Sequence, residues 1–304
     1  MENEKLLNPL VDIIFKAIFG NPKNADILTS FIKSVLEDST DEYNSIKIAD
    51  TNLKVESKND KMGILDVKVH TKSGQTINVE VQVLPVPEFK ERLMFYTSKM
   101  ITEQIKKGEP YSQIKKVASI VILDFELIKE NTAYHNAFVL YDKNTQTQFI
   151  DKLEIHTLEL PKLPASDENS NLINWLKFFK SENKEEFKML AKRSPELQKA
   201  YEELAYLSQD ENTREVYEAT IKARRDEISR IEGAKKEGKE EGLKQGLEQG
   251  LEQGLEQGLE QGLERGKIEI AKEALKEGSS IDFISKITGL EKSVIITLKE
   301  EIEI

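Results

Sequence analysis

The clearest pattern along the chain is an alternation of apolar and polar residues in two short segments separated by a turn. The first segment covers residues 64–70, the second covers residues 77–83, and Lys72-Ser73-Gly74 lies between them. Because side chains alternate between the two faces of a strand, this pattern predicts a β-hairpin with one apolar and one polar face. Six side chains would share the polar face: Asp66, Lys68, His70, Asn78, Glu80 and Gln82.

The turn determines which polar residues face each other. With a three-residue loop at 72–74 and Gly74 in the left-handed conformation, Asp66 lies directly opposite Glu80. Cross-strand partners are ~5 Å apart at Cβ, and two carboxylates at that separation can bind a divalent cation. The same pattern is typical of an ordinary half-solvated antiparallel pair that binds no metal. The hairpin alone leaves both interpretations open.

The segments on either side of the hairpin predict an α/β fold. Apolar residues at helical spacing predict helices over 9–36, with a break at Gly20-Asn21-Pro22, and over 88–107. Apolar runs predict further strands at 46–56, 117–125, 136–142 and 153–160. The expected architecture is a mixed central sheet flanked by helices and followed by an all-α C-terminal region, with Trp175 in a helical core.

Residues 213–277 predict one long, charged helix with a tandem repeat at its centre. Glycine recurs every four residues from Gly238 to Gly266, and four consecutive units read Gly-Leu-Glu-Gln. Four residues turn an α-helix by about 400°, so each row of identical side chains moves ~40° around the helix per unit. Two roles stay open: a spacer produced by repeat expansion, and a helix that joins copies of the chain because glycine permits close approach.

Composition narrows the class of protein. The chain has 304 residues, of which 38% are hydrophobic and 33% charged, as is typical of a soluble protein of about two domains. It has no cysteine, which excludes disulfides, cysteine metal sites and cysteine nucleophiles. We expect no membrane partner and a cytoplasmic location, because the sequence has no run of ~18 apolar residues and residues 1–10 have no apolar signal core.

The net charge of −11 counts against nucleic acid as a partner, because DNA-binding proteins are usually basic at least locally. A bound metal ion and a local basic strip can outweigh this overall charge. The candidates for such a strip follow the hairpin in sequence: Lys90, Arg92, Lys99, Lys106, Lys107, Lys115 and Lys116.

No other motif competes with the hairpin. The three histidines, His70, His135 and His156, have no metal-ligand spacing and are expected on strand surfaces. The sequence contains no Walker-type loop, no Gly-x-Ser-x-Gly elbow and no zinc motif. The hairpin acids are therefore the best candidates for chemistry.

An ordered set of motifs resembles the Rpn family of recombination-promoting nucleases, whose members are also described as transposases. The set consists of Asp12-Ile13-Ile14-Phe15-Lys16 with Ile18-Phe19-Gly20, the Asp66 strand with Glu80-Val81-Gln82, the residues Arg92, Tyr96, Gln104, Gly108 and Tyr111, and the Gly-x-x-x-Gly tail. The resemblance covers residues 7–165 by motif and rests on the set, since no single motif is specific. The family is a branch of the PD-(D/E)XK nuclease superfamily, which implies a restriction-endonuclease-like fold.

This resemblance and the apolar patterns divide the chain into four parts. Residues 1–165 are expected to form a PD-(D/E)XK nuclease-like domain, and residues 166–212 a helical extension. Residues 213–277 would be the repeat helix, and residues 278–304 a small helix-turn-helix-like cap.

The resemblance also implies which residues would cut DNA. Asp66 and Glu80 would bind Mg²⁺, or Mn²⁺ in its place, together with the backbone carbonyl of Val81. Gln82 stands where the superfamily pattern usually has lysine; its neutral amide would orient the attacking water. Lys68, on the same face of the hairpin, is a candidate to replace the missing lysine.

Two helices would supply further residues. Asp12 would complete the metal shell or orient a metal ligand, and the alternative is a helix-start cap or an i,i+4 pair with Lys16. One face of the helix predicted at 88–107 carries four side chains: Arg92, Tyr96, Lys99 and Glu103. Arg92, Tyr96 and Lys99 would contact DNA, with Arg92 binding a phosphate through both of its terminal nitrogens. The alternative is an exposed, salt-bridged helix face.

Three functions are compatible with these observations. The first is a metal-dependent DNA endonuclease that promotes recombination or serves a mobile element or a defence system. The second is a catalytically inactive nuclease fold that binds DNA or protein, with copies joined through the repeat helix. The third is a structural interaction protein in which the hairpin acids are only part of a solvated face. The resemblance favours the first, and only the first predicts metal-dependent cleavage.

Overall fold

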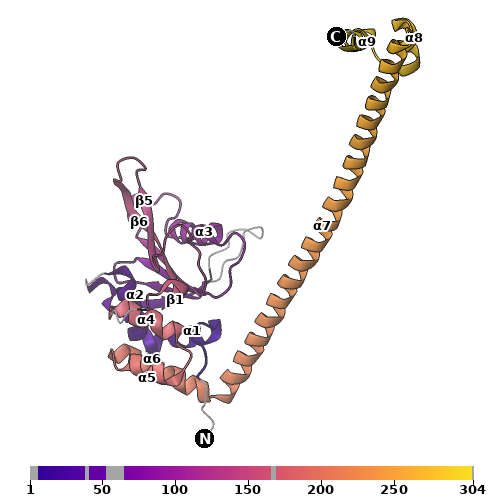
Figure 1. Cartoon of the computed structure of the whole chain (residues 1–304). Helices are drawn as coiled ribbons and strands as arrows, with labels where there is room; N and C mark the ends of the chain where they lie inside the picture. The colour runs from indigo at the N-terminus through magenta and orange to yellow at the C-terminus, as the bar shows by residue number, and fades with distance from the viewer. Residues whose placement is uncertain (1–5, 38–40, 53–64, 166–168, 303–304) are drawn as a thin grey trace. The chain divides into compact units, whose positions relative to one another are not determined.

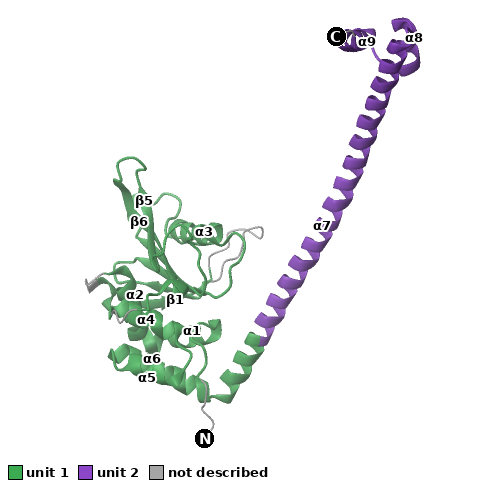
Figure 2. Cartoon of the chain, viewed as in Figure 1, with its two compact units in different colours: residues 1–221 green, residues 222–304 purple. Residues whose placement is uncertain are grey.

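The computed structural model describes residues 6–37, 41–52, 65–165 and 169–302 (Figure 1). The chain divides into two compact units, residues 1–221 and residues 222–304 (Figure 2). The finer division into four parts stays a prediction.

A mixed six-stranded sheet forms the centre of the first unit. Its strands are β1 (Lys47–Ala49), β2 (Val67–His70), β3 (Thr76–Gln82), β4 (Val117–Leu123), β5 (His135–Tyr141) and β6 (Gln148–Glu159). Their order across the sheet is β1-β2-β3-β4-β6-β5. Strands β3, β4 and β6 run parallel, and the other neighbours pair antiparallel. The predicted mixed sheet is confirmed.

Helices cover both faces of this sheet (Figure 1). One face carries α3 (Phe89–Thr102), whereas the other carries α1 (Asp12–Phe19), α2 (Ala25–Leu36) and α4 (Asn171–Lys180), with α5 (Lys184–Ala191) and α6 (Pro195–Gln209) packed against them. Short 3₁₀ turns lie at η1 (Pro22–Asn24), η2 (Asp41–Asn44), η3 (Tyr111–Gln113) and η4 (Leu160–Lys162). Trp175 is 1% exposed in the main core, as predicted, and stacks edge-on against Phe19 and Phe31.

The first helix is fixed in place by its apolar side. Its four buried side chains are Ile14, Phe15, Ile18 and Phe19, which follow the helical spacing of the sequence. The helix ends at Gly20, whose N–H donates to the carbonyl of Lys16 at 2.9 Å, and Pro22 follows in the next turn. Asp12 and Lys16 lie on the opposite, half-exposed side.

The hairpin between β2 and β3 has the predicted register. Gly74 adopts a left-handed conformation with φ of +90°, and its N–H donates to the carbonyl of Thr71 at 3.1 Å. Val67 pairs with Val79, and the apolar face of the hairpin is buried in the main core. The polar face is solvated only in part: His70 is exposed, whereas Lys68 is 8% exposed and Asn78 is fully buried.

Several element boundaries differ from the predicted ones. Helix α3 ends at Thr102, five residues before the predicted end, and a side chain binds the backbone that follows: Glu109 Oε2 accepts from the N–H of Lys106 at 2.7 Å. Strand β6 begins five residues earlier than predicted, at Gln148, and forms a hairpin with β5. Strand β1 covers only 47–49 of the predicted strand, whose last part, 53–56, lies outside the described residues.

Helix α7 (Glu211–Lys276) begins in the first unit and continues through the second, close to the predicted range. The six leucines of the repeat, at positions 243, 247, 251, 255, 259 and 263, are 56–78% exposed. In the second unit, α8 (Ile281–Thr288) and α9 (Lys292–Ile302) form a small core with the end of α7 around Ala271, Ile284 and Ile295. Within the described ranges, every helix is too short or too polar to cross a membrane.

Removal of one aromatic ring tests how firmly α1 is anchored. Phe15 is fully buried, so Phe15→Ala should lower the free energy of unfolding by ~3–5 kcal/mol. Phe149→Ala is the matched control, because Phe149 is 83% exposed, and should change it by less than ~0.5 kcal/mol. Urea unfolding followed by the fluorescence of the single tryptophan, Trp175, measures both. Equal losses in the two variants would contradict the described core.

Candidate functional site

Asp66 and Glu80 lie opposite each other at one end of the β2–β3 hairpin. The register that pairs Val67 with Val79 continues by one residue to place Asp66 beside Glu80. Both carboxylates are largely shielded from water, since the side chains are 17% and 12% exposed. Asp66 Oδ2 accepts a hydrogen bond from the N–H of Val81 at 3.0 Å, which fixes the carboxylate against β3.

The two acids are difficult to ionise together. Burial and then the charge of the neighbouring Asp66 raise the pKa of Glu80 to about 7, against the opposite effect of Arg92. The pKa of Asp66 is also raised, first by burial and then by the charge of Asp12, although the Val81 N–H and Lys16 lower it. A cation between the two carboxylates would favour the charged form of each. Two ionised carboxylates carry two negative charges, which balance the charge of a divalent ion.

Asn78 adds an unsatisfied polar group to this site. It is fully buried two residues before Glu80 and on the same face of β3. Neither polar atom of its amide makes a hydrogen bond of normal geometry to a described residue, although the amide is close enough to Glu80 to favour the charged carboxylate. A buried amide without partners indicates a place for water or an ion. The residues present therefore fit a hard cation with oxygen ligands.

Asp66 and Glu80 form a pair rather than part of a larger ligand cluster in the part of the chain that the structure describes. Among residues 6–37, 41–52, 65–165 and 169–302, no cluster of three or more His, Asp or Glu side chains is arranged to hold a metal. Mg²⁺ suits such a pair, because it usually binds one or two carboxylates and keeps several waters.

Helix α1 brings a lysine to the first acid. Lys16 Nζ lies 2.9 Å from Asp12 Oδ1 and 3.2 Å from Asp66 Oδ1. Although burial lowers the pKa of Lys16, the two carboxylates outweigh it and raise this pKa above its ordinary value. Of the two alternatives for Asp12, the i,i+4 pair with Lys16 is present. Asp12 is not the helix cap, because the N-cap residue is Val11, which has no side-chain hydrogen bond to the helix. The contact between Lys16 and Asp66 differs from the prediction, which paired Lys16 with Asp12 alone; no local sequence signal indicates it.

Helix α3 brings an arginine to the second acid. Arg92 Nη2 lies 2.9 Å from Gln82 Oε1 and 3.4 Å from Glu80 Oε1, and the guanidinium sits 5.2 Å from the centre of the Phe89 ring. Gln82 Nε2 donates to the carbonyl of Leu84 at 2.9 Å. The prediction of a salt-bridged helix face is wrong for Arg92, because its acidic partner is on the sheet.

The other residues predicted on α3 lie along the same side of the site. Tyr96 packs against the small cluster of Leu65, Met100 and Val117, and Lys99 is half-buried one turn further along α3. Glu103 binds Lys68 at 3.2 Å, and both side chains are nearly buried. Lys68 is therefore held beneath α3 rather than directed at the acid pair.

One member of the predicted basic strip is not available for it. Lys116 Nζ is 2.6 Å from Glu154 and 3.1 Å from Asp151, at the opposite end of β4 from the acids. Lys90, Lys106, Lys107 and Lys115 are exposed.

The expectation that all three histidines lie on strand surfaces is wrong for His156. It is 5% exposed, and its Nδ1 lies 3.0 Å from His135 Nε2 across β5 and β6. Its Nε2 lies 3.2 Å from Glu154 Oε2. Burial, followed by the charge of His156, lowers the pKa of His135 to about 4, so His135 is neutral near pH 7. The two rings form a hydrogen-bonded part of the fold.

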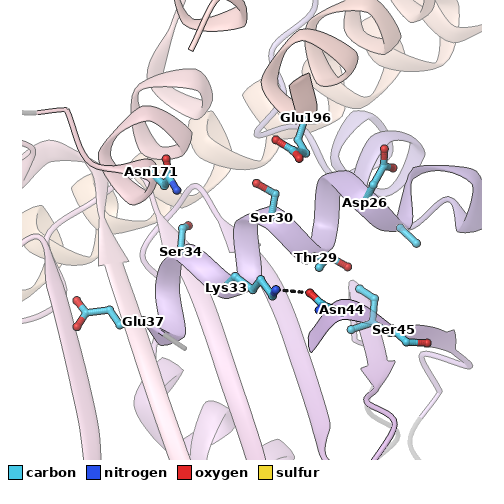
Figure 3. A pocket seen from close by; sticks show the side chains of 12 residues that line it. Asp26, Thr29, Ser30, Lys33, Ser34, Glu37, Asn44, Ser45, Asn171 and Glu196 are labelled. Carbon is cyan, nitrogen blue, oxygen red and sulfur yellow. Dashed lines mark hydrogen bonds between the residues drawn. The ribbon is translucent and has the colours of Figure 1, made fainter. Parts of the chain in front are cut away.

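A polar pocket of about 800 Å³ lies along α2 and does not include the acid pair (Figure 3). Thr29, Ser30 and Ser34 line it with their hydroxyl groups, and Lys33 donates to Asn44 at its rim. The acids lie instead at one end of β2 and β3, with α1 and α3 contributing the cations beside them.

Comparison with known proteins agrees with this arrangement. The family model described as PD-(D/E)XK nuclease family transposase matches residues 9–234. The matched range contains the whole sheet, helices α1 to α6, and the acid pair with its two cations. No curated protein and no solved structure matches the chain.

Glu80 should make the metal-free protein less stable as the pH rises. Its pKa is about 7 in the fold and 4.5 ordinarily, so between these values the folded state retains a proton that the unfolded state releases. We expect the free energy of unfolding in EDTA to fall over this window in the wild type. The Glu80→Gln variant has no carboxyl group at this position, so its free energy of unfolding should fall less over the same pH range. Urea unfolding at a series of pH values tests the difference, and identical profiles would count against it.

Proposed function

This chain belongs to the family of PD-(D/E)XK nuclease transposases, and we propose that it is a metal-dependent DNA endonuclease. The observation that carries the proposal is the placement of Asp66 opposite Glu80, with both carboxylates largely shielded from water. Two like charges in such a place are costly unless a cation joins them. The cuts would promote recombination, or serve a mobile element or a defence system.

Asp66 and Glu80 would hold Mg²⁺, with Mn²⁺ as a substitute and the carbonyl of Val81 as a further ligand. Asp66 lies just before β2, which begins at Val67. Its carboxylate accepts the N–H of Val81, so the backbone of Val81 is next to the acid pair. When bound, the ion supplies positive charge to the scissile phosphate and lowers the pKa of a bound water.

The neighbouring side chains would position the substrate. Arg92 would bind a phosphate of the DNA backbone, and Tyr96 and Lys99 would extend this contact along α3. Gln82 would orient the attacking water through its amide once Arg92 has turned to the DNA. Asp12 would hold Lys16 beside Asp66, since Lys16 contacts both carboxylates.

One observation favours a second function, that of a catalytically inactive module that binds DNA or protein. Both ends of the Gln82 amide are already engaged, because Nε2 donates to Leu84 and Oε1 accepts from Arg92. A Gln82 that keeps these contacts when DNA is bound has a fixed amide plane, with only one N–H and one lone pair left for a water. Cleavage separates the two functions.

Supercoiled plasmid incubated with Mg²⁺ tests the endonuclease. We expect the wild type to nick or linearise it, and Asp66→Asn and Glu80→Gln each to cut at least ~100-fold more slowly, a loss of about 2.7 kcal/mol in transition-state stabilisation. Glu91→Gln is the matched control, because Glu91 is an exposed carboxylate on α3, and should cut at the wild-type rate. An intact plasmid in both Mg²⁺ and Mn²⁺, or equal cutting by all variants, would favour the inactive module.

We further propose that copies of the chain associate through α7. Each glycine in the repeat costs ~1 kcal/mol in a helix interior, so partners are needed to stabilise this part of the helix. The leucines of the repeat are exposed, and a Cβ added at any repeat glycine would meet no atom within 4 Å, so a second helix has room to approach. A second copy would cover the leucine row.

Size-exclusion chromatography with light scattering tests the association. We expect the full chain to exceed the monomer mass of 34.7 kDa. Replacing Leu251, Leu255 and Leu259 by Gln should return it to that mass, because these side chains are 70–73% exposed and free to pack. Replacing Gln253 and Gln257 by Ala is the control in the same helix and should leave the mass unchanged. A monomeric wild type would rule out the association at the concentration used.

A further inference from the structure

Lys16 occupies the place beside Asp66 that a bound cation would need. Its ammonium lies 3.2 Å from Asp66 Oδ1 and 2.9 Å from Asp12 Oδ1. The other oxygen of Asp66 accepts the Val81 N–H at 3.0 Å, so Oδ1 is the oxygen turned toward a cation. An ammonium and a metal ion therefore compete for the same carboxylate.

The side chain of Lys16 can leave this place without any change in the fold. It is 38% exposed, whereas four buried apolar side chains hold the helix that carries it. A lysine has a flexible four-carbon stem, and its ammonium can donate in three directions. Asp12 lies on the same helix, so its contact with Lys16 keeps the ammonium near the site when Asp66 is taken.

The other two cations near the acids are held more tightly. Lys68 binds Glu103, and the two side chains are only 10% and 12% exposed. Arg92 bonds to Gln82 and lies over a phenylalanine ring on α3. Lys16 differs from Lys68 because its partner is an acid that would bind the metal and because its side chain reaches solvent. Arg92 also contacts such an acid, Glu80, at 3.4 Å and is 37% exposed, but its hydrogen bond to Gln82 and the ring of Phe89 hold it, whereas both contacts of Lys16 are to carboxylates.

We propose that Lys16 is an exchangeable counter-ion of the site, an inference that rests on the proposed nuclease function. Without metal, its ammonium neutralises Asp66 and keeps the acid pair in place. With metal on Asp66 and Glu80, the ammonium turns from Asp66 to an oxygen of the DNA phosphate. Loss of Lys16 should then have two effects of opposite sign: tighter metal binding and slower cleavage.

The test measures Mn²⁺ affinity by calorimetry and plasmid cleavage at saturating Mn²⁺, using the full chain. Lys16→Met should bind Mn²⁺ about tenfold more tightly, because the variant lacks the ammonium group that repels the metal ion and competes with it for Asp66. The same variant should cleave at least about tenfold more slowly, since a charged hydrogen bond to the phosphate is lost. Lys16→Arg retains the charge and should stay near the wild type in both measurements. Lys23→Met, at an exposed lysine just beyond α1, should change neither.

The two measurements separate failure of this inference from failure of the proposed function. If the wild type binds Mn²⁺ and cuts, but Lys16→Met shows unchanged or weaker Mn²⁺ affinity, Lys16 is a structural salt-bridge partner and the inference is overturned. If the wild type neither binds Mn²⁺ nor cuts, the inference and the nuclease function are overturned together. Thermal unfolding checks that Lys16→Met is folded; Lys16→Gln, with the same expected changes, replaces it if it is not.

Discussion

The structure depends on a conflict between burial and charge at Asp66 and Glu80. A site that shields two carboxylates from water raises the free energy of the doubly charged state, and the fold must offset this with positive charge. It does so from two directions, with Lys16 on α1 and Arg92 on α3, so that helices from both sides of the sheet converge on one pair of acids. Removal of either cation would leave an acid without its internal partner. Two separately packed helices are thereby tied to the position of a single hairpin.

The parts of the fold that could be predicted from sequence are those that local periodicity determines. Alternation along two strands and a left-handed Gly74 fix the hairpin register, because a shift of one residue would bury the polar side chains in the main core. The helical spacing of Phe15 and Phe19, and of the residues around Trp175, likewise places these rings in a core before any partner is known. Asp66 and Glu80 could be placed opposite each other for the same reason.

The parts that could not be predicted depend on packing between distant segments. Alternation shows that one face of the hairpin is polar, but it does not show that α3 covers part of that face and pairs Glu103 with Lys68. The contact between Lys16 and Asp66 joins segments that have no local relation, so only the fold reveals it. The chain after α3 is fixed by Gln104, whose Oε1 accepts the N–H of Lys115 in the connection to β4 while its Nε2 donates to Met100 of α3. The roles of these residues in catalysis rest on geometry and family, and stay proposals.

The repeat in α7 has a consequence for how this protein can change over generations. A four-residue unit corresponds to twelve nucleotides, so slippage in the coding sequence adds or removes whole units and keeps the reading frame. Each unit gained lengthens the helix by ~6 Å and turns everything beyond it by ~40° about the helix axis. Nine units would complete a full rotation and restore the original facing. The tract therefore allows the length of the helix, and the rotation about its axis from one end to the other, to vary in fixed steps while the sequences on either side stay unaltered.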